Sequence, residues 1–172
     1  MGKTTLFRKF AFNTIDQDYY LFSDYFSKNV EIKQTITRFM LFDTMNSERR
    51  RAIPKAIYRI VNGIILAYDI TSRDSFNHID YWKKECEKHS QKDLKFVLVG
   101  LKCELSDQRE VRREEGESLA ISYNIPFFEV SSFEDTNVEC IFINLFDQFQ
   151  EKPKAPDHSE NILAPQTRNR CG

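Results

Sequence analysis

Apolar side chains recur along this chain with two spacings, one typical of helices and one typical of buried strands. Between residues 4 and 13, the apolar residues Leu6, Phe7, Phe10 and Ala11 fall on one face of a helix. Further helices are predicted over residues 75–87, 112–123 and 137–149, and strands over residues 26–32, 35–42, 61–70, 94–101 and 126–130. After the first two strands the elements alternate, which predicts an α/β fold with a mostly parallel sheet and helices on both faces.

Polar and turn-forming residues separate these elements. Residues 14–25 have no clear period and are expected to form a loop, and the two strands that follow are expected to pair as a hairpin. Residues 48–58 predict a short irregular helix that is interrupted near Pro54. The end of the chain is polar and proline-containing, so we expect one domain over residues 1–150 and a flexible tail over residues 151–172.

The helical spacing also predicts which side chains turn inward. In the helix at 75–87 the inward set is Phe76, Ile79, Trp82 and Cys86. In the last helix it is Val138, Ile141, Phe142, Leu145, Phe146 and Phe149.

Composition narrows the possible function classes. The chain has 172 residues and a formal net charge of −1, which suits one domain with a sizeable core and argues against a strongly basic nucleic-acid binder. Its four cysteines are widely spaced, so they predict reduced thiols of a cytoplasmic protein and no zinc site. The most apolar run, residues 64–68, is too short to span a bilayer, and we expect no signal peptide.

The first residues carry candidate phosphate-binding chemistry. Gly2, Lys3, Thr4 and Thr5 match the end of the phosphate-loop motif G-x-x-x-x-G-K-[ST] and lead directly into the predicted helix. In that motif glycine lets the backbone approach the phosphates, lysine contacts their oxygens, a hydroxyl ligates Mg²⁺, and the helix N-terminus offers N–H donors. The alternative is that a threonine simply caps an ordinary helix. The first glycine of the motif would precede residue 1.

An acidic residue follows the second predicted strand. Asp43 stands at the carboxyl end of a mostly apolar strand, where ligands of open α/β sheets bind. After a phosphate-loop helix, an aspartate in this place is the expected partner of Mg²⁺. The alternative is an aspartate that begins a turn.

Over residues 2–150 the chain resembles the small GTPases, and within them the Rab branch. The resemblance rests on Tyr68-Asp69-Ile70-Thr71, Ser75-Phe76, Trp82, residues 96–100 and residues 109–117. It implies a P-loop small-GTPase fold whose first strand is missing here, and it implies GTP or GDP and Mg²⁺ as ligands. Lys3 would contact the β- and γ-phosphates, and Thr4 and Asp43 would hold Mg²⁺.

Both switch regions depart from the family pattern. The threonine of the first switch aligns with Leu21 or Phe22, neither of which can ligate a metal, and Ser23 becomes available only after a shift of register. In the second switch the family glycine is Asn46, and the glutamine that orients the attacking water is Ser47. Because serine is too short for that role, we expect hydrolysis to be impaired.

The guanine-binding boxes are partly kept. Lys102 and Glu104 match the lysine and the carboxylate of the family pattern Asn-Lys-x-Asp, although glutamate is one methylene longer, and Leu101 replaces the asparagine. We expect guanine selection to weaken by roughly ten- to a hundredfold.

The last box, Ser-Ala-Lys in the family, is Ser131-Ser132-Phe133 here. The resemblance implies that the Ser132 N–H meets the base oxygen and that Phe133 stacks where the lysine stem lies.

Partner binding and membrane attachment are also implied by the resemblance. The aromatic triad that Rab proteins present to effectors and regulators corresponds to Phe26, Phe42 and Ile57, with sheet packing as the alternative role of both phenylalanines. A single cysteine, Cys171, stands where the family usually carries two prenylated ones, and one lipid gives only marginal membrane binding.

Three functions stay open from sequence alone. The first is a Rab-like GTP-binding switch in vesicle transport, on the cytosolic face of endomembranes, with weakened nucleotide binding and hydrolysis. A pseudo-GTPase interaction module without hydrolysis is the second. The third is a non-functional truncated product.

Overall fold

The computed structural model describes residues 2–15, 25–44, 55–90 and 92–150. In these ranges the elements follow one another in this order: α1 (Lys3–Phe12), β1 (Tyr25–Ile32), β2 (Thr35–Phe42), α3 (Lys55–Ile60), β3 (Gly63–Asp69), α4 (Arg73–Asn77), α5 (Ile79–His89), β4 (Lys95–Leu101), the 3-10 turn η1 (Ser106–Gln108), α6 (Arg113–Tyr123), β5 (Phe127–Val130) and α7 (Val138–Gln150). All of the strands predicted from the sequence are present within a few residues of their expected bounds.

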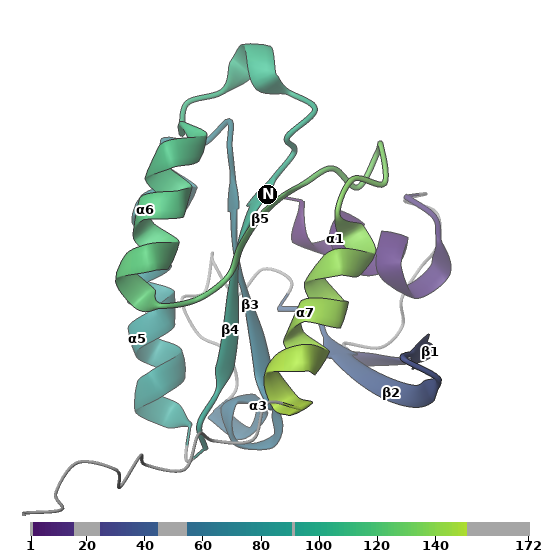
Figure 1. Cartoon of the computed structure of the whole chain (residues 1–172). Coiled ribbons are helices and arrows are strands. Elements are labelled where there is room, and N and C mark those ends of the chain that lie inside the picture. The colour runs from purple at the N-terminus through teal and green to yellow at the C-terminus, as the bar shows by residue number, and fades with distance from the viewer. Residues whose placement is uncertain (1, 16–24, 45–54, 91, 151–172) are drawn as a thin grey trace, which may run out of the picture.

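A three-stranded parallel sheet forms the centre of the fold. Its strand order is β3-β4-β5, and the register pairs Ile64 with Phe96 and Leu98 with Phe127. Helices α5 and α6 cover one face, while α1 and α7 cover the other (Figure 1). The α/β class with helices on both faces of a parallel sheet is therefore confirmed.

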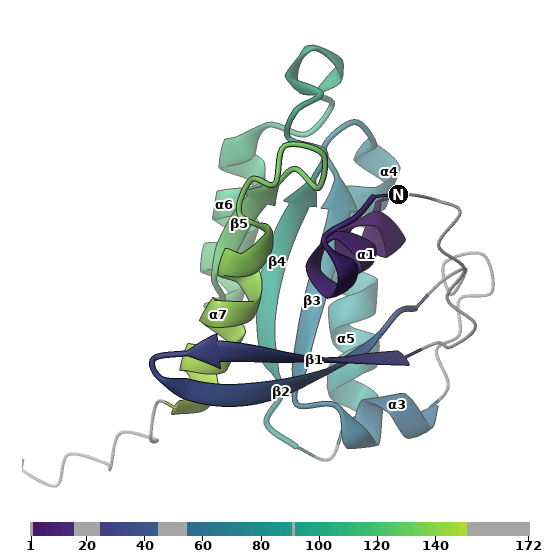
Figure 2. The same cartoon turned by 90° about the vertical axis from the view of Figure 1, so that its right-hand side faces the viewer.

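The predicted hairpin is also confirmed, and it forms a separate two-stranded sheet. Strands β1 and β2 pair antiparallel through a two-residue turn at Lys33 and Gln34, whose φ angles of 51° and 64° are left-handed, as such hairpin turns require. Figure 2 shows the hairpin crossing below α1. Among the described strands, none pairs with the second edge of β2 or of β3. The described strands thus form two separate sheets, the hairpin and the parallel sheet that begins at β3.

The core has one layer on each face of the parallel sheet. On one side α1, α7 and the hairpin enclose a cluster in which the rings of Phe10 and Phe142 stack with centroids 3.5 Å apart. On the other side α3, α5 and α6 enclose a second cluster that includes Tyr58, Ile79 and Cys86. These two layers bury most of the residues that the helical spacing predicted to be inward.

Two sequence predictions about helices were wrong. The helix expected over 75–87 is divided into α4 and α5 at His78, whose ring Nδ1 lies 2.7 Å from the Asp74 carbonyl oxygen that its own backbone N–H also contacts. The Trp82 N–H donates to the His78 carbonyl at 3.2 Å, so backbone hydrogen bonds continue across the junction of the two helices. Phe149 was expected to be buried but is 43% exposed. The helix expected over 48–58 is described only from residue 55 onward.

A bidentate ion pair joins the start of α4 to the first turn of α6. The Arg73 guanidinium donates to both carboxylate oxygens of Glu115, at 2.7 and 2.9 Å. The hydrogen bonds from Arg73 are the main cause that lowers the pKa of Glu115 from 4.5 to about 2. In the folded chain this carboxyl therefore binds fewer protons than in the unfolded chain, so acid favours unfolding.

We expect this pair to contribute to stability above about pH 4.5 and to lose its contribution as the pH falls toward 2. Thermal unfolding measured at pH 7, 5, 4 and 3 should show a falling midpoint. The variant Arg73→Met should show a smaller fall over the same interval, because its Glu115 has lost the hydrogen bonds from Arg73 that lower the carboxyl pKa most. An equal pH dependence in both proteins would contradict this role of the pair.

No helix of the described residues is long and apolar enough to cross a membrane.

Candidate nucleotide site

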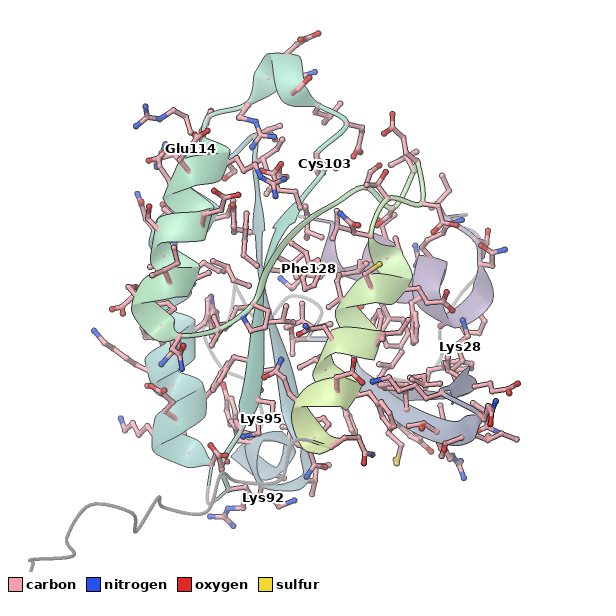
Figure 3. All side chains as sticks on the ribbon, in the orientation of Figure 1. Lys28, Lys92, Lys95, Cys103, Glu114 and Phe128 are labelled. Atoms are coloured by element: carbon pink, nitrogen blue, oxygen red, sulfur yellow. The ribbon has the colours of Figure 1, made fainter. Side chains whose placement is uncertain are left out.

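The candidate site lies at the carboxyl ends of the parallel strands. The loops after β3, β4 and β5 gather there, and the chain begins at the same edge (Figure 2). Figure 3 places Cys103, just after β4, at this end, whereas Lys92 and Lys95 lie at the opposite end. In open α/β sheets this carboxyl edge is where ligands bind, so the fold brings most of the predicted nucleotide residues to one edge.

The N-terminus of α1 supplies backbone donors. Gly2 is the N-cap residue, with φ −85° and ψ 22°, and it makes no side-chain cap, while no acidic residue stands in the first turn. The first intrahelical hydrogen bond runs from the Leu6 N–H to the Gly2 carbonyl, at 3.0 Å. The helix itself therefore provides no acceptor for the N–H groups of Lys3, Thr4 and Thr5. Thr4 lies inside the helix, so the alternative of a threonine N-cap is wrong.

Lys3, Asp43 and Asp69 line one cleft of about 1140 Å³ that lies between the hairpin and β3. The carboxylate of Asp43 follows the last residue of β2, as the sequence predicted. Within the described residues no group of three His, Cys, Asp or Glu side chains could enclose a metal ion. A hydroxyl and one carboxylate nevertheless suit Mg²⁺, which keeps several waters and takes its other ligands from phosphate oxygens.

Asp69 forms the most fully buried ion pair of the site. Its residue is 4% exposed, and its Oδ2 lies 2.6 Å from the Lys102 ammonium. Its Oδ1 accepts hydrogen bonds from the Thr71 N–H at 3.0 Å and the Thr71 hydroxyl at 2.7 Å. Burial alone would raise the pKa of Asp69, but the hydrogen bonds from Lys102 and Thr71 outweigh it and hold the pKa below its ordinary value.

The pairing with Lys102 was not predicted from the sequence. From the sequence, Lys102 was expected to contact only the guanine base. Asp69 was used only as one of the residues on which the family resemblance rests. The available signal was that Asp69 ends an apolar strand and that Asp43 directly follows another one. Two strand ends with a carboxylate predict a shared acidic edge that requires a cation.

The segment after β4 holds the predicted guanine residues in a tight turn. Lys102 has a left-handed φ of 66°, and its carbonyl accepts the Leu105 N–H at 2.9 Å, while the Cys103 N–H donates to Val130 on β5 at 3.2 Å. Within the described residues, Glu104 Oε2 is buried and has no hydrogen-bond donor. It is therefore an acceptor that a ligand N–H could satisfy.

Leu101 takes no part in a polar site. The residue that replaces the family asparagine is 1% exposed and belongs to the core at the end of β4. This side chain therefore serves apolar packing in the described fold.

The loop after β5 is held by its own backbone. Ser131 and Thr136 exchange two N–H···O hydrogen bonds, at 3.2 and 2.9 Å, and the Ser131 hydroxyl accepts the Glu134 N–H at 3.0 Å. Ser132 is buried, whereas the Phe133 ring is 67% exposed. An exposed ring on a fixed loop is available for stacking on a planar ligand.

An ion pair ties this loop to the helix that opens the chain. The Lys9 ammonium lies 3.1 Å from Asp135 Oδ2. Two of the segments assigned to nucleotide binding are thereby connected directly.

The structure does not bring the predicted effector triad onto one face. Tyr25 pairs with Phe42, so Phe26 projects to the opposite side of the hairpin, where its ring packs 4.5 Å from that of Phe12. The exposed partner of Phe42 is Tyr25, with ring centroids 6.1 Å apart. Ile57 lies on α3 and is half-buried. The alternative role in packing therefore describes Phe26 better than effector contact does.

Several predicted site residues lie outside the described part of the chain. They are Leu21, Phe22, Ser23, Asn46, Ser47 and Cys171.

The model of the Ras family matches residues 1–151. Ras-related protein Rab-8B of Homo sapiens is 38% identical over 148 residues, which cover 84% of this chain and 71% of that protein. GTP-binding protein YPT1 of Saccharomyces cerevisiae is 33% identical over 153 residues, or 88% and 74% of the two chains. Ras-related protein Rab-8A of Rattus norvegicus is 31% identical over 177 residues, or 96% and 86%.

The fold and these similarities define the class of protein. The chain belongs to the Ras family. Within this family it is a Rab-like small GTPase.

Proposed function

We propose that this chain is a Rab-like GTP-binding switch of intracellular vesicle transport. The observation that carries the proposal is the gathering of the start of α1 and the loops after β3, β4 and β5 at the carboxyl edge of the strands (Figure 2), together with the cleft that Lys3, Asp43 and Asp69 line. The name of the relative YPT1, a GTP-binding protein, supports the choice of nucleotide.

Each group has a role in this proposal. The N–H groups of the first turn of α1 and the Lys3 ammonium bind phosphate oxygens. Thr4 and Asp43 would hold Mg²⁺, which neutralises phosphate charge when it is bound. The Glu104 carboxylate accepts hydrogen bonds from the guanine N–H groups, the Ser132 N–H meets the base oxygen, and the exposed Phe133 ring stacks beside the base.

We expect binding and hydrolysis to be weaker than in typical family members. Glu104 is one methylene longer than the family aspartate, and Leu101 offers no amide. Ser47, at the position of the water-orienting glutamine, favours the second candidate function, which is an interaction module that does not hydrolyse GTP. In either case the proposed location is the cytosolic face of endomembranes. Cys171, the proposed lipid site, would provide only weak attachment on its own.

Substitutions at Glu104 test the guanine assignment. Glu104→Asp restores the shorter carboxylate and should strengthen GDP binding by up to about tenfold, whereas Glu104→Ala removes the acceptor and should abolish the preference for GDP over ATP. Because a ligand that binds only the folded state raises its melting temperature, the readout is the shift in midpoint with millimolar GDP or ATP and Mg²⁺.

The matched control is Asp107→Ala, which removes an exposed carboxylate from the same loop. It should leave both nucleotide shifts unchanged. Equal GDP shifts in the unmodified chain, Glu104→Asp and Glu104→Ala would contradict the assignment.

A further inference from the structure

The two segments assigned to the guanine base lie in two loops, here called the first base loop, residues 102–112, and the second base loop, residues 131–137. Figure 1 shows the first base loop leaving β4 and returning to α6 beyond the end of the sheet. Its internal backbone hydrogen bonds, such as Leu105 N–H to Lys102 and Gln108 N–H to Leu105, each span three residues. Bonds of this kind shape single turns, so they do not fix the distance between the two loops.

Glu129, on β5 just before the second base loop, contacts both loops. Its carboxylate accepts two hydrogen bonds from the Arg109 guanidinium, at 2.5 and 3.0 Å. Its backbone carbonyl accepts the side-chain amide of Asn137 at 2.8 Å. Arg109 belongs to the first base loop and Asn137 ends the second. One residue of β5 is therefore a common anchor of both loops.

The contact between Arg109 and Glu129 has a fixed geometry. Glu129 is 7% exposed, and the Arg109 side chain is 21% exposed. The same guanidinium donates to the Val111 carbonyl at 3.1 Å, and Arg113 Nη1 lies 3.6 Å from the second carboxylate oxygen. A planar guanidinium that bonds a carboxylate through two nitrogens sets orientation as well as distance. The pair therefore holds the returning half of the first base loop in one place relative to β5.

The other half of the first base loop is attached to the next residue of β5. The Cys103 N–H donates to the Val130 carbonyl at 3.2 Å. Glu104, the acceptor proposed for the guanine N–H groups, lies between this attachment and the ion pair along the chain. Ser132, the donor proposed for the base oxygen, follows Val130 by two residues. The place of the carboxylate relative to the donor thus depends on attachments to two neighbouring residues of one strand.

The alternative is that the Arg109–Glu129 pair serves stability alone. The loss of hydration offsets much of the attraction within a buried ion pair, so a pair of apolar side chains of similar volume often stabilises a fold as well. An apolar pair would not fix the orientation of a loop in the way that a bidentate contact does. This difference, together with the loops that the pair connects, favours a positioning role.

We propose that Arg109 and Glu129 are positioning residues that set the preference for guanine over adenine nucleotides. They hold the Glu104 carboxylate and the Ser132 N–H at the separation that fits the N–H groups and the oxygen on one edge of a guanine base. Adenine has no such oxygen, and the phosphates bind elsewhere, so ATP binding does not depend on this separation. The inference rests on the proposed function, because it concerns the same nucleotide site.

The variant Arg109→Lys tests the role of the bidentate contact. Lysine keeps the charge and an apolar stem but cannot bond both carboxylate oxygens in one plane. Displacement of a fluorescent GDP analogue should show GDP binding weakened by about tenfold and ATP binding changed by less than about twofold. Glu129→Gln keeps the shape of the side chain and removes its charge, and it should change the two affinities in the same direction.

The matched control is Leu94→Ala, which lowers stability away from both base loops. Leu94 is buried in the core next to β4, at the end of the sheet where Figure 3 places Lys92 and Lys95. Its truncation should lower the urea midpoint but leave the ratio of GDP to ATP affinity unchanged, at a temperature where all variants are folded. A preference for GDP that falls with stability in general would fall in this variant too.

Amide exchange followed by NMR tests the positioning without nucleotide. In Arg109→Lys, exchange of the Cys103 and Thr136 amides should be faster by about tenfold, because their loops have lost a shared anchor. Exchange of the Leu98 amide, which donates to Pro126 at the other end of β5, should hardly change.

The outcomes separate this inference from the proposed function. Absence of a GDP preference in the unmodified chain would overturn both. A preference that is present and survives in Arg109→Lys and Glu129→Gln, or that Leu94→Ala lowers equally, would overturn the inference alone. Failure of Arg109→Lys to fold, or unchanged exchange of the Cys103 and Thr136 amides in that variant, would show a purely structural pair and would also overturn it.

Discussion

Replacing Lys102 by methionine is expected to lower the free energy of unfolding by about 2–3 kcal/mol. The substitution leaves the buried Asp69 carboxylate without the ammonium that lies 2.6 Å away. Breaking a fully buried pair costs about 3–5 kcal/mol, and the partial exposure of the Lys102 side chain, 35%, lowers the expected loss. Methionine keeps the apolar stem and adds no new backbone strain at the left-handed position. Urea unfolding followed by circular dichroism measures the change.

A double-mutant cycle shows whether the loss comes from the ion pair. In the double variant Lys102→Met with Asp69→Asn no buried charge remains, so its loss should be smaller than the sum of the two single losses by at least about 1 kcal/mol. The control is Lys84→Met, which removes a pair with Asp80 on the exposed side of α5 and should cost less than about 1 kcal/mol. Similar small losses for Lys102→Met and Lys84→Met would contradict the structural role given to Lys102.

Gly116→Ala is expected to lower the free energy of unfolding by about 2 kcal/mol, although alanine is normally the better helix former. A β-carbon at Gly116 would overlap the Tyr68 hydroxyl and lie 2.7 Å from the Phe127 ring. Both rings belong to the packed cluster beneath α6, and Tyr68 is fully buried, so they have little room to move. Overpacking of this kind costs about 1–3 kcal/mol. The loss is measured from the urea midpoint.

Tyr68→Phe separates the effect of the hydroxyl from that of the ring. Within the described residues the Tyr68 hydroxyl is buried without a hydrogen-bond partner, so its removal should be neutral or stabilising. In the Tyr68→Phe variant, Gly116→Ala should lower the free energy of unfolding by less than it does in the unmodified chain. The control Ser118→Ala, on the exposed side of the same helix, should change stability by less than about 0.5 kcal/mol. A neutral Gly116→Ala in the unmodified background would contradict the packing described here.

The sequence predicted the elements well where their periodicity was strong. The apolar runs of β3 and β4 and the regular spacing of α7 left little doubt about their type. The sequence did not predict the division between α4 and α5 at His78. The exposure of Phe149 was also missed, since helical spacing gives a face but not the extent of the layer that covers it.

The sequence predicted which residues belong to the candidate site better than it predicted the contacts among them. The resemblance identified Lys3, Asp43 and the two base-binding segments, and the fold brings α1 and the strand ends to one edge. The Lys102–Asp69 pair depends on three-dimensional proximity between two strand ends. The effector role of Phe26 stays a prediction, and the sequence did not show that strand register places this ring on the face opposite Phe42.

The most direct test of the central claim is a competition titration of the unmodified chain. A fluorescent GDP analogue is bound in the presence of Mg²⁺ and then displaced by unlabelled GDP or by ATP. The account predicts saturable binding and displacement by GDP at a concentration at least tenfold lower than by ATP. Absence of saturable binding, or displacement by both nucleotides at the same concentration, would contradict a guanine-nucleotide site in this protein.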